Sequence, residues 1–206
     1  MKLYHHPLSP NCRKVLTVVN HLGLDLEMEV VDILKGKQRD PEFLAINPNG
    51  KVPALVDGEL SLWESNAVMS YLAGKAEKND LWPPDMRRYD IMRWMYWEQA
   101  HWSRGTSTLI GEYVFKSMRG EEPDPERVAE GEAEFSKYAS VLNNHLEGKT
   151  WLVGDGLTLA DFAVGALMTY AVPARYPLDD FPHINAWYAR LEEQEAWQKS
   201  APPRPG

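Results

Sequence analysis

The apolar positions in the first part of the chain switch between two periods. Residues 2–5 are short and strand-like, and residues 27–32 alternate polar and apolar side chains, as a half-buried strand does. Between them, helical spacing is found for Val15, Val18, Val19 and Leu22. Ser9-Pro10 is a good N-cap followed by proline at the first helical position, and Gly23 ends the stretch. The pattern predicts a strand, a helix and a strand.

A short helix, a hairpin and a longer helix are predicted next. Residues 41–46 favour a short helix. Residues 54–56 and 60–63 resemble two strands joined at Asp57-Gly58, which is a strong hairpin signal. A helix is expected from residue 65 to about residue 75. The order β-α-β-α-β-β-α indicates a small α/β domain with a mixed sheet.

The rest of the chain has helical patterns throughout. Residues 86–115 predict one long helix, and a second helix is expected to begin at Asp124-Pro125 and to end at Gly148. The residues expected to face inward on the second helix are Val128, Phe135, Tyr138, Leu142 and Leu146. Thr158 and Asp161 have the spacing of a capping box at the start of a buried helix, for which we expect a structural role only.

Charge and aromatic content divide the chain in two. Residues 1–78 are nearly neutral, whereas residues 79–206 carry almost all of the net charge of −8 and most of the tryptophans. At the transition, residues 79–85 contain two consecutive prolines that would break a helix. We expect an α/β domain at 1–78, a linker at 79–85 and an all-α domain at 86–206.

Composition excludes several classes of function. A pI near 5.3 argues against nonspecific binding to nucleic acid or to an anionic membrane surface. The sequence has no apolar run long enough to span a membrane and no secretion signal at its beginning. Cys12 is the single cysteine, so no intrachain disulfide can form, and a cytoplasmic protein is expected.

The first candidate for chemistry is Ser9-Pro10-Asn11-Cys12, at the start of the first predicted helix. The N-terminus of a helix stabilises an anion through its unpaired N–H groups and its dipole. Thioredoxin-like proteins have Cys-x-x-Cys at this place, and here Ser9 stands at the first position. A serine hydroxyl can donate a hydrogen bond to the thiolate of a ligand. Alternatively, Ser9 is only a helix cap.

The second candidate is the stretch from Asn47 to Leu55. A proline that opens a strand after a β-branched residue is a candidate for a cis bond, here Val52–Pro53. The Val52 backbone could then pair with an extended peptide, and Lys51 could meet a carboxylate. The alternative is a plain turn before a strand, with Lys51 in solvent.

The third candidate is Trp63-Glu64-Ser65-Asn66, at the start of the third predicted helix. Ser65 can cap that helix, and its hydroxyl and free N–H groups can bind a ligand carboxylate. Glu64 could pair with an ammonium group of the ligand. The alternative is a capped helix whose first-turn acid complements the dipole.

Together these motifs resemble the cytosolic glutathione transferases, in particular bacterial, serine-type members similar to the theta, delta and phi classes. In the order and at the spacing of that family, the chain has Ser9-x-x-Cys12-Arg13, Asn47-Pro48-x-Gly50-Lys51-Val52-Pro53, Trp63-Glu64-Ser65 and Thr158-x-x-Asp161. The resemblance covers nearly the whole chain. It implies a thioredoxin-like N-terminal domain, an all-helical C-terminal domain, glutathione as co-substrate without a metal, and a homodimer.

The resemblance also implies roles for individual residues. Ser9 matches the serine that donates a hydrogen bond to the glutathione sulfur. Ser9-Pro10-Asn11 is also similar to the Thr-Pro-Asn of a bacterial subgroup with disulfide-reductase activity, so Asn11 is a second catalytic candidate. The positions that match glutathione contacts are Gln38, Lys51, Val52, Pro53, Glu64 and Ser65, together with Gln99, which aligns with a residue that reaches the partner subunit's glutathione.

The predicted function is transfer of the glutathione thiolate to a small electrophile. The second substrate is expected between the domains, against the long helix, where Trp97, His101 and Arg104 recur at i, i+4 and i+7. An aromatic stripe more often belongs to a core or a dimer contact than to a substrate site. The alternative functions are a disulfide reductase that uses two glutathione molecules and a binding module without catalysis.

Overall fold

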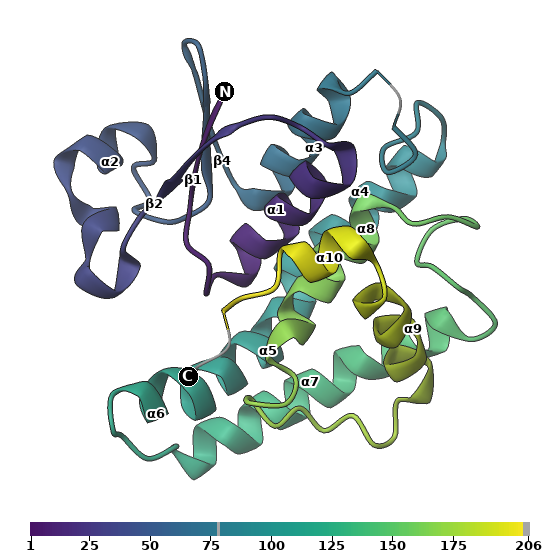
Figure 1. Cartoon of the computed structure of the whole chain (residues 1–206). Coiled ribbons are helices and arrows are strands. Elements are labelled where there is room, and N and C mark those ends of the chain that lie inside the picture. Colours follow the sequence, from purple (N-terminus) through teal and green to yellow (C-terminus); the bar gives the residue numbers. More distant parts are fainter. Residues whose placement is uncertain (78, 204–206) are drawn as a thin grey trace. The chain divides into compact units, whose positions relative to one another are not determined.

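The computed structural model describes residues 1–77 and 79–203. Contacts between residues divide the chain into two units, Met1–Trp82 with Glu193–Gly206, and Pro83–Glu192. Figure 1 labels the elements of both. The division falls between Trp82 and Pro83, and the C-terminal segment from Glu193 is grouped with the first unit.

The first unit contains a four-stranded mixed sheet. Its strands are β1 (Lys2–His5), β2 (Glu27–Val30), β3 (Ala54–Asp57) and β4 (Leu60–Trp63), in the spatial order β2-β1-β3-β4. Strand β1 is parallel to β2 and antiparallel to β3, and β3 is antiparallel to β4. The predicted thioredoxin-like order is confirmed.

The helices of the first unit begin and end close to the residues that the sequence indicates. They are α1 (Pro10–Leu22), α2 (Pro41–Ile46) and α3 (Ser65–Lys75), with short 3₁₀ turns η1 (Ile33–Lys35) and η2 (Lys37–Arg39) before α2. Ser9 caps α1, and Gly23 ends it with a left-handed φ of 61°. A glycine is suited to that position because it has no Cβ to clash.

The sheet has a helical layer on each side. Alternation along β1 points Leu3 and Tyr4 to opposite faces. Tyr4 meets the Phe43 ring of α2 edge-to-face, with 5.9 Å between centroids, and Ala54 packs in the same cluster. Helix α2 therefore covers this face, whereas α1 and α3 pack together on the face of Leu3, which is fully buried.

The C-terminal helix α10 (Glu195–Lys199) lies beside α1 (Figure 1). The Arg13 guanidinium lies 4.0 Å from the centroid of the Trp197 ring and donates to the Trp197 carbonyl. The hydroxyls of Thr17 and Ser200 are 2.7 Å apart. Trp197 is 1% exposed, so this segment completes the packing around α1.

The helical unit begins with a continuous run where the sequence predicts one long helix. It consists of α4 (Arg87–Trp97), η3 (Glu98–Trp102), α5 (Ser103–Leu109), η4 (Ile110–Phe115) and α6 (Lys116–Met118). The segments η3 and η4 are π-helical. Trp97 and Trp102, five residues apart, stack with 5.8 Å between centroids, in keeping with the wider π turn.

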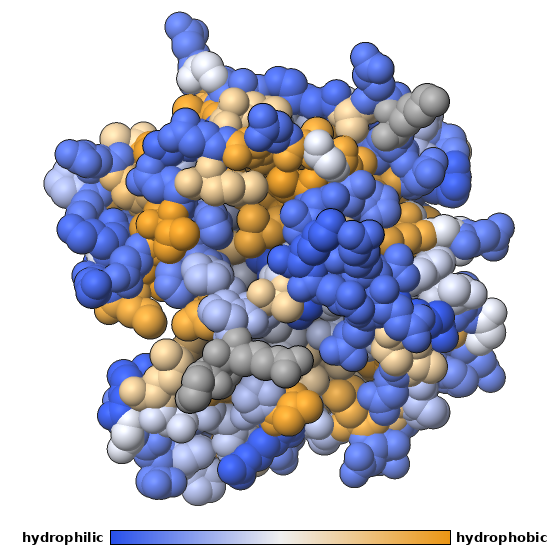
Figure 2. All heavy atoms as spheres, in the orientation of Figure 1, coloured by the Kyte–Doolittle hydropathy of each residue, from blue (hydrophilic) through white to orange (hydrophobic). Residues whose placement is uncertain are grey.

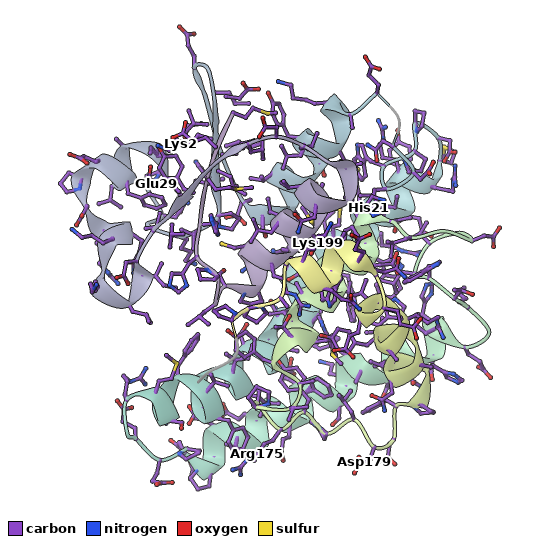
Figure 3. All side chains as sticks on the ribbon, viewed as in Figure 1. Lys2, His21, Glu29, Arg175, Asp179 and Lys199 are labelled. Atoms are coloured by element: carbon purple, nitrogen blue, oxygen red, sulfur yellow. The ribbon has the colours of Figure 1, made fainter. Side chains whose placement is uncertain are left out.

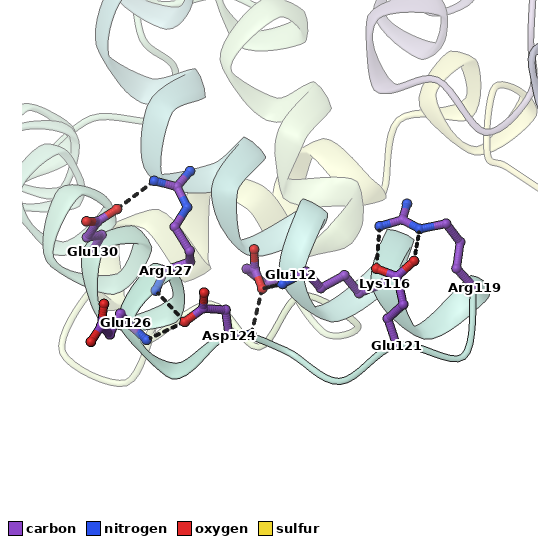
Figure 4. A network of polar contacts seen from close by, with 8 residues as sticks. All are labelled: Glu112, Lys116, Arg119, Glu121, Asp124, Glu126, Arg127 and Glu130. Carbon is purple, nitrogen blue, oxygen red and sulfur yellow. Dashed lines mark hydrogen bonds and ion pairs between the residues drawn. The ribbon is translucent and has the colours of Figure 1, made fainter.

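Helix α7 (Pro125–Leu146) packs on α5. Asp124 caps it by accepting from the N–H groups of Glu126 and Arg127 (Figure 4). The Glu112 carboxylate accepts from the Lys116 ammonium at 2.6 Å and from the Asp124 N–H at 2.8 Å, which fixes the turn between the helices. Of the residues predicted to face inward, Phe135, Leu142 and Leu146 are buried, whereas Val128 and Tyr138 are half-buried.

The capping box at Thr158 and Asp161 is confirmed at the start of α8 (Leu159–Gly165). The 3₁₀ segment η5 (Ala166–Tyr170) and α9 (Pro182–Glu192) follow. The fully buried Asp161 carboxylate accepts 2.9 Å hydrogen bonds from the N–H groups of Leu152 and Thr158 and from the Trp187 indole. One carboxylate thus joins the preceding loop, α8 and α9.

The surface is polar over most of the face drawn in Figure 2. Lys2 on β1 forms ion pairs with two residues of β2, Glu27 at 3.0 Å and Glu29 at 2.6 Å. Figure 3 labels Lys2 and Glu29. Among the described residues, no helix combines the length and the apolar composition that crossing a membrane would require.

We expect Asp161→Ala to lower the free energy of unfolding by at least about 4 kcal/mol, because four buried donors, among them the Thr158 hydroxyl at 3.0 Å, would lose their acceptor at roughly 1–3 kcal/mol each. Asp124→Ala is the matched control, since that cap is exposed, and it should cost only about 1 kcal/mol. Urea unfolding measures both. Equal losses in the two variants would contradict a special role for Asp161.

Candidate functional site

The N-terminus of α1 carries the first candidate residue as a helix cap. Ser9 has an extended backbone, and its hydroxyl oxygen accepts from the Cys12 N–H at 3.3 Å. A hydroxyl that accepts a hydrogen bond keeps its own proton to donate. The capping role is therefore confirmed, and it is compatible with donation from Ser9 to a ligand thiolate.

Cys12 does not supply a thiol at this site. Its side chain is fully buried, and its sulfur accepts from the His6 N–H at 3.4 Å. Burial raises the pKa of Cys12 to about 11, with the hydrogen bonds from Ser9 and His6 opposing the shift. A thiolate at the mouth of α1 would have to come from a ligand.

The loop before β3 is held in one conformation. The Val52–Pro53 peptide bond is cis, as the sequence indicates. The buried Asn47 amide donates to the Lys51 carbonyl at 2.6 Å, and its oxygen accepts from the Asn49 N–H at 3.0 Å. Asn47 stands in the predicted motif without an assigned role, and the structure shows that its side chain holds the turn and the Lys51 carbonyl.

The β1–β3 ladder ends where Tyr4 pairs with Ala54, so Val52 lies beyond it. Gln38 and Lys51 belong to adjacent loops. Gly50 has a φ of 59°, and a Cβ there would stand 3.1 Å from the Gln38 carbonyl oxygen. Glycine therefore allows the two loops to approach closely. Lys51 is exposed, and the buried side-chain oxygen of Gln38 finds no partner among the described residues.

The start of α3 differs from its prediction. Ser65 was expected to cap the helix, but Glu64 occupies the N-cap and Ser65 is the first helical residue, so that prediction is wrong. Glu64 has a φ of 69° and a ψ of 112°, a conformation that L-residues rarely adopt. Observed strain of this kind is concentrated at functional sites.

Ser65 instead joins the starts of two helices. Its hydroxyl donates to the Asn11 side-chain oxygen at 3.2 Å. Next to it, the fully buried Lys14 donates from its ammonium to the Asn66 side-chain oxygen at 3.0 Å. The N-termini of α1 and α3 thus lie together above a buried cation. Both helix dipoles and this charge favour an anion here.

The electrophile candidates lie in the helical unit. Trp97 meets the Tyr138 ring edge-to-face at 6.2 Å, and His101 stacks on the same ring at 5.0 Å. Arg104 is exposed, as is Gln99 in η3. The π turn displaces the i, i+4, i+7 stripe that the sequence predicts. The ring contacts of Trp97 and His101 therefore favour a role in packing the helical core over a role in binding the second substrate.

Two cavities lie outside the Ser9 region. One of about 280 Å³ in the helical unit is lined by Arg93, Trp94, Trp97, Val141 and His145. Another, of about 400 Å³, opens beside β2 and α2, and its acidic lining residues are Glu29, Asp32, Asp40 and Glu42. In residues 1–77 and 79–203, no three His, Cys, Asp or Glu side chains gather closely enough to hold a metal ion.

Comparison with known proteins identifies the family. Residues 1–74 match the family model "Glutathione S-transferase, N-terminal domain", and residues 107–195 match "Glutathione S-transferase, C-terminal domain". The chain is 37% identical over 206 residues to glutathione S-transferase 3 of Zea mays, which covers 97% of this chain and 92% of that protein.

Solved structures agree. Glutathione transferase F7 of Populus trichocarpa superposes with a TM-score of 0.89 at 27% identity, covering 97% of this chain and 96% of that one. Glutathione S-transferase-I bound with lactoylglutathione gives 0.86 at 30% identity, with 97% of both chains covered. The chain belongs to the glutathione S-transferase family.

Proposed function

We propose that this protein transfers the glutathione thiolate to small electrophilic substrates and that Ser9 keeps the thiol ionised. The observation that supports the proposal is the Ser9 hydroxyl at the N-terminus of α1, above a cysteine that is itself buried. Glutathione brings the thiol that the chain lacks there. Attack of the sulfur on an electrophilic carbon then forms the thioether and releases the leaving group.

The energy required is modest. A free thiol has a pKa of about 8.5, and lowering it by ~2 units needs about 2.7 kcal/mol. One hydrogen bond to the charged sulfur contributes roughly 1.5–3 kcal/mol, and the helix dipole adds up to ~1 kcal/mol. Ser9 and α1 therefore suffice without a metal or a general base.

The rest of the tripeptide is assigned to the surrounding residues. The Val52 backbone before Pro53 pairs with the cysteinyl backbone, and Lys51 with Gln38 meets the glycyl carboxylate. Glu64 holds the γ-glutamyl ammonium. Ser65 and the free N–H groups of α3 receive the γ-glutamyl carboxylate, which the buried Lys14 also attracts.

Asn11 is assigned a supporting role. Its side-chain oxygen accepts from Ser65, so its amide group is oriented by α3. That amide can donate toward the ligand beside the Ser9 hydroxyl. Asn11 thereby links the groups that hold the two ends of the γ-glutamyl-cysteine segment.

The second substrate and the assembly are proposed more broadly. Residues 1–78 would bind glutathione and, after the linker at 79–85, residues 86–206 would supply the electrophile site. Of the three residues predicted there, Trp97 and His101 pack against Tyr138, so we assign them to the wall of that site. Arg104 is exposed, and its guanidinium would favour a polar or anionic substrate. We also propose a cytoplasmic homodimer in which Gln99 reaches the partner's glutathione.

We expect Ser9→Ala to lower kcat/KM for an aromatic chloride roughly 10- to 100-fold, because the lost hydrogen bond is worth roughly 1.5–3 kcal/mol. The pKa of the bound thiol should rise by about 1–2 units, measured from the pH profile.

The wild-type protein distinguishes the alternative functions. Turnover of hydroxyethyl disulfide above that of the aromatic chloride would favour the reductase alternative, and failure to bind glutathione would favour a binding module.

Ser9→Asp separates capping from thiol activation. Aspartate is as good an N-cap as serine, so stability should stay near wild type, whereas Ser9→Ala should lose about 1 kcal/mol. Aspartate has no proton to donate at neutral pH and repels a thiolate, so its rate should fall below that of Ser9→Ala. Full rates and an unchanged pH profile in Ser9→Ala would reduce Ser9 to a cap.

Glu64→Gly tests the strained position. Relief of roughly 1–3 kcal/mol of backbone strain, less the entropy cost of glycine, should raise the free energy of unfolding by about 1 kcal/mol. Affinity for glutathione should fall at least about tenfold as the ammonium contact is lost. Calorimetry and urea unfolding measure the two effects.

Arg175→Gly is the matched control, because Arg175 also has a positive φ, of 53°, but lies in the helical unit. It should leave glutathione affinity unchanged. Wild-type affinity in Glu64→Gly would remove Glu64 from the binding site.

A further inference from the structure

The turn that carries Ser9 is organised by His6. The His6 carbonyl accepts from the Ser9 N–H at 3.0 Å, which closes a four-residue turn with Pro7 at its second position. The His6 ring nitrogen Nδ1 accepts from the Leu8 N–H at 3.2 Å. The His6 N–H donates to the Cys12 sulfur at 3.4 Å. His6 therefore contacts the turn from both backbone and ring, and it also contacts the first turn of α1.

The hydrogen bond to Leu8 fixes the state of the imidazole. A backbone N–H can only donate, so Nδ1 must be an acceptor and carry no proton. The ring is neutral, with its proton on Nε2. If Nδ1 were protonated, its N–H would face the Leu8 N–H, and two donors cannot form a hydrogen bond. The turn beside Ser9 would then open.

The surroundings favour the neutral ring. His6 is only 6% exposed, and its burial lowers its pKa, with Asp32 at the end of β2 opposing that shift. The neighbouring His5 on β1 has a pKa that is lowered by its burial and by His6, and burial raises the pKa of the Cys12 thiol to about 11, so it is uncharged at neutral pH. Among residues 1–77 and 79–203, the titratable groups that act on His6 or contact it in this way are Asp32, His5 and Cys12.

We propose that neutral His6 is a positioning residue for thiol activation, holding the Ser9 hydroxyl where it meets the glutathione sulfur. This inference rests on the proposed function. His6 touches neither the ligand nor the reacting atoms, and it acts through the turn. A displacement of Ser9 by about 1 Å would be costly because the hydrogen bond to the sulfur depends on distance and angle.

The sign of the pH dependence follows from the lowered pKa. Above the pKa of an unfolded histidine, near 6.5, the ring is neutral in both states, and its contribution to the turn is fully present. As the pH falls below that value, the unfolded chain takes up a proton that the folded turn resists. The contribution of His6 is therefore lost on the acid side.

The experiment compares His6→Leu, which removes the acceptor, with His6→Asn, whose side-chain oxygen can replace Nδ1 and does not titrate. His5→Leu is the matched control, since that neighbouring imidazole has a buried Nδ1 with no partner among the described residues. The measurements are the pH profile of kcat/KM, the ultraviolet absorbance of the bound thiolate, and the affinity for S-methylglutathione, which has no thiol to ionise.

For His6→Leu we expect a rise of about 1 unit in the pKa of the bound thiol and a roughly tenfold lower rate near neutral pH. Affinity for S-methylglutathione should change less than about twofold. His6→Asn should restore the wild-type pKa of the bound thiol. Because asparagine does not titrate, this variant should lack the fall in kcat/KM at acid pH that protonation of His6 causes in the wild type. His5→Leu should behave like wild type.

An unchanged thiol pKa in a folded His6→Leu protein would overturn the proposal, as would an equal shift in His6→Leu and His6→Asn. If His6→Leu does not fold, the failure of His6→Asn to reproduce the wild-type thiol pKa would overturn it instead. These outcomes presuppose a bound thiolate in the wild-type protein. Absence of that thiolate would contradict the proposed function itself.

Discussion

The hydrogen bond between Ser65 and Asn11 is the contact on which the candidate site depends. It joins the N-termini of α1 and α3, two elements that are far apart in sequence. Each terminus alone is an ordinary helix start with a weak preference for anions. Held together beside the buried Lys14, the two helix starts and its charge all favour an anion, which is the property that the proposed site uses.

The same helix α1 is held from its other side by the end of the chain. Arg13 follows Cys12 directly, and its guanidinium stacks on Trp197 of α10. Thr17 and Ser200 add a hydrogen bond one turn further on. The chain thus leaves the first unit at the linker, forms the helical unit and returns to brace the helix that carries Ser9. The position of the Ser9 hydroxyl consequently depends on residues at both ends of the sequence.

Local signals made most of the fold predictable. The bounds of α2 and β4 agree with the residues that the sequence indicates, because proline starts and a tight turn leave little freedom. The π turns in the long helix could not be predicted, since helical periodicity does not report that Trp97 stacks on Trp102 and meets Tyr138 of α7. The return of α10 to α1 depends on contacts across most of the chain, which periodicity does not report.

The candidate site was predictable in its parts and not in its connections. Motif spacing indicated Ser9, Val52–Pro53 and Glu64-Ser65, and the cis bond is present. The cap of α3 was misassigned because serine is the more common N-cap, whereas Glu64 takes that place through a rare positive φ. The hydrogen bonds of Asn47 stay within its own loop, whereas the pairing of Asn11 with Ser65 depends on which helix starts meet in space. A sequence pattern gives no direct measure of such meetings.

Thioredoxin-like sites have a reactive cysteine at the position of Ser9. Because this chain has serine there, Cys12 can be a buried, un-ionised packing residue. A thioredoxin-like site with its own thiol needs that sulfur exposed and easily ionised. Here burial raises the pKa of Cys12 to about 11, which removes it from thiol exchange and lets it pack beneath the turn. In the function that we propose, the N-terminus of α1 instead stabilises the sulfur of the bound glutathione. The chain supplies the electrostatic environment, and the reactive atom is renewed with every glutathione that binds.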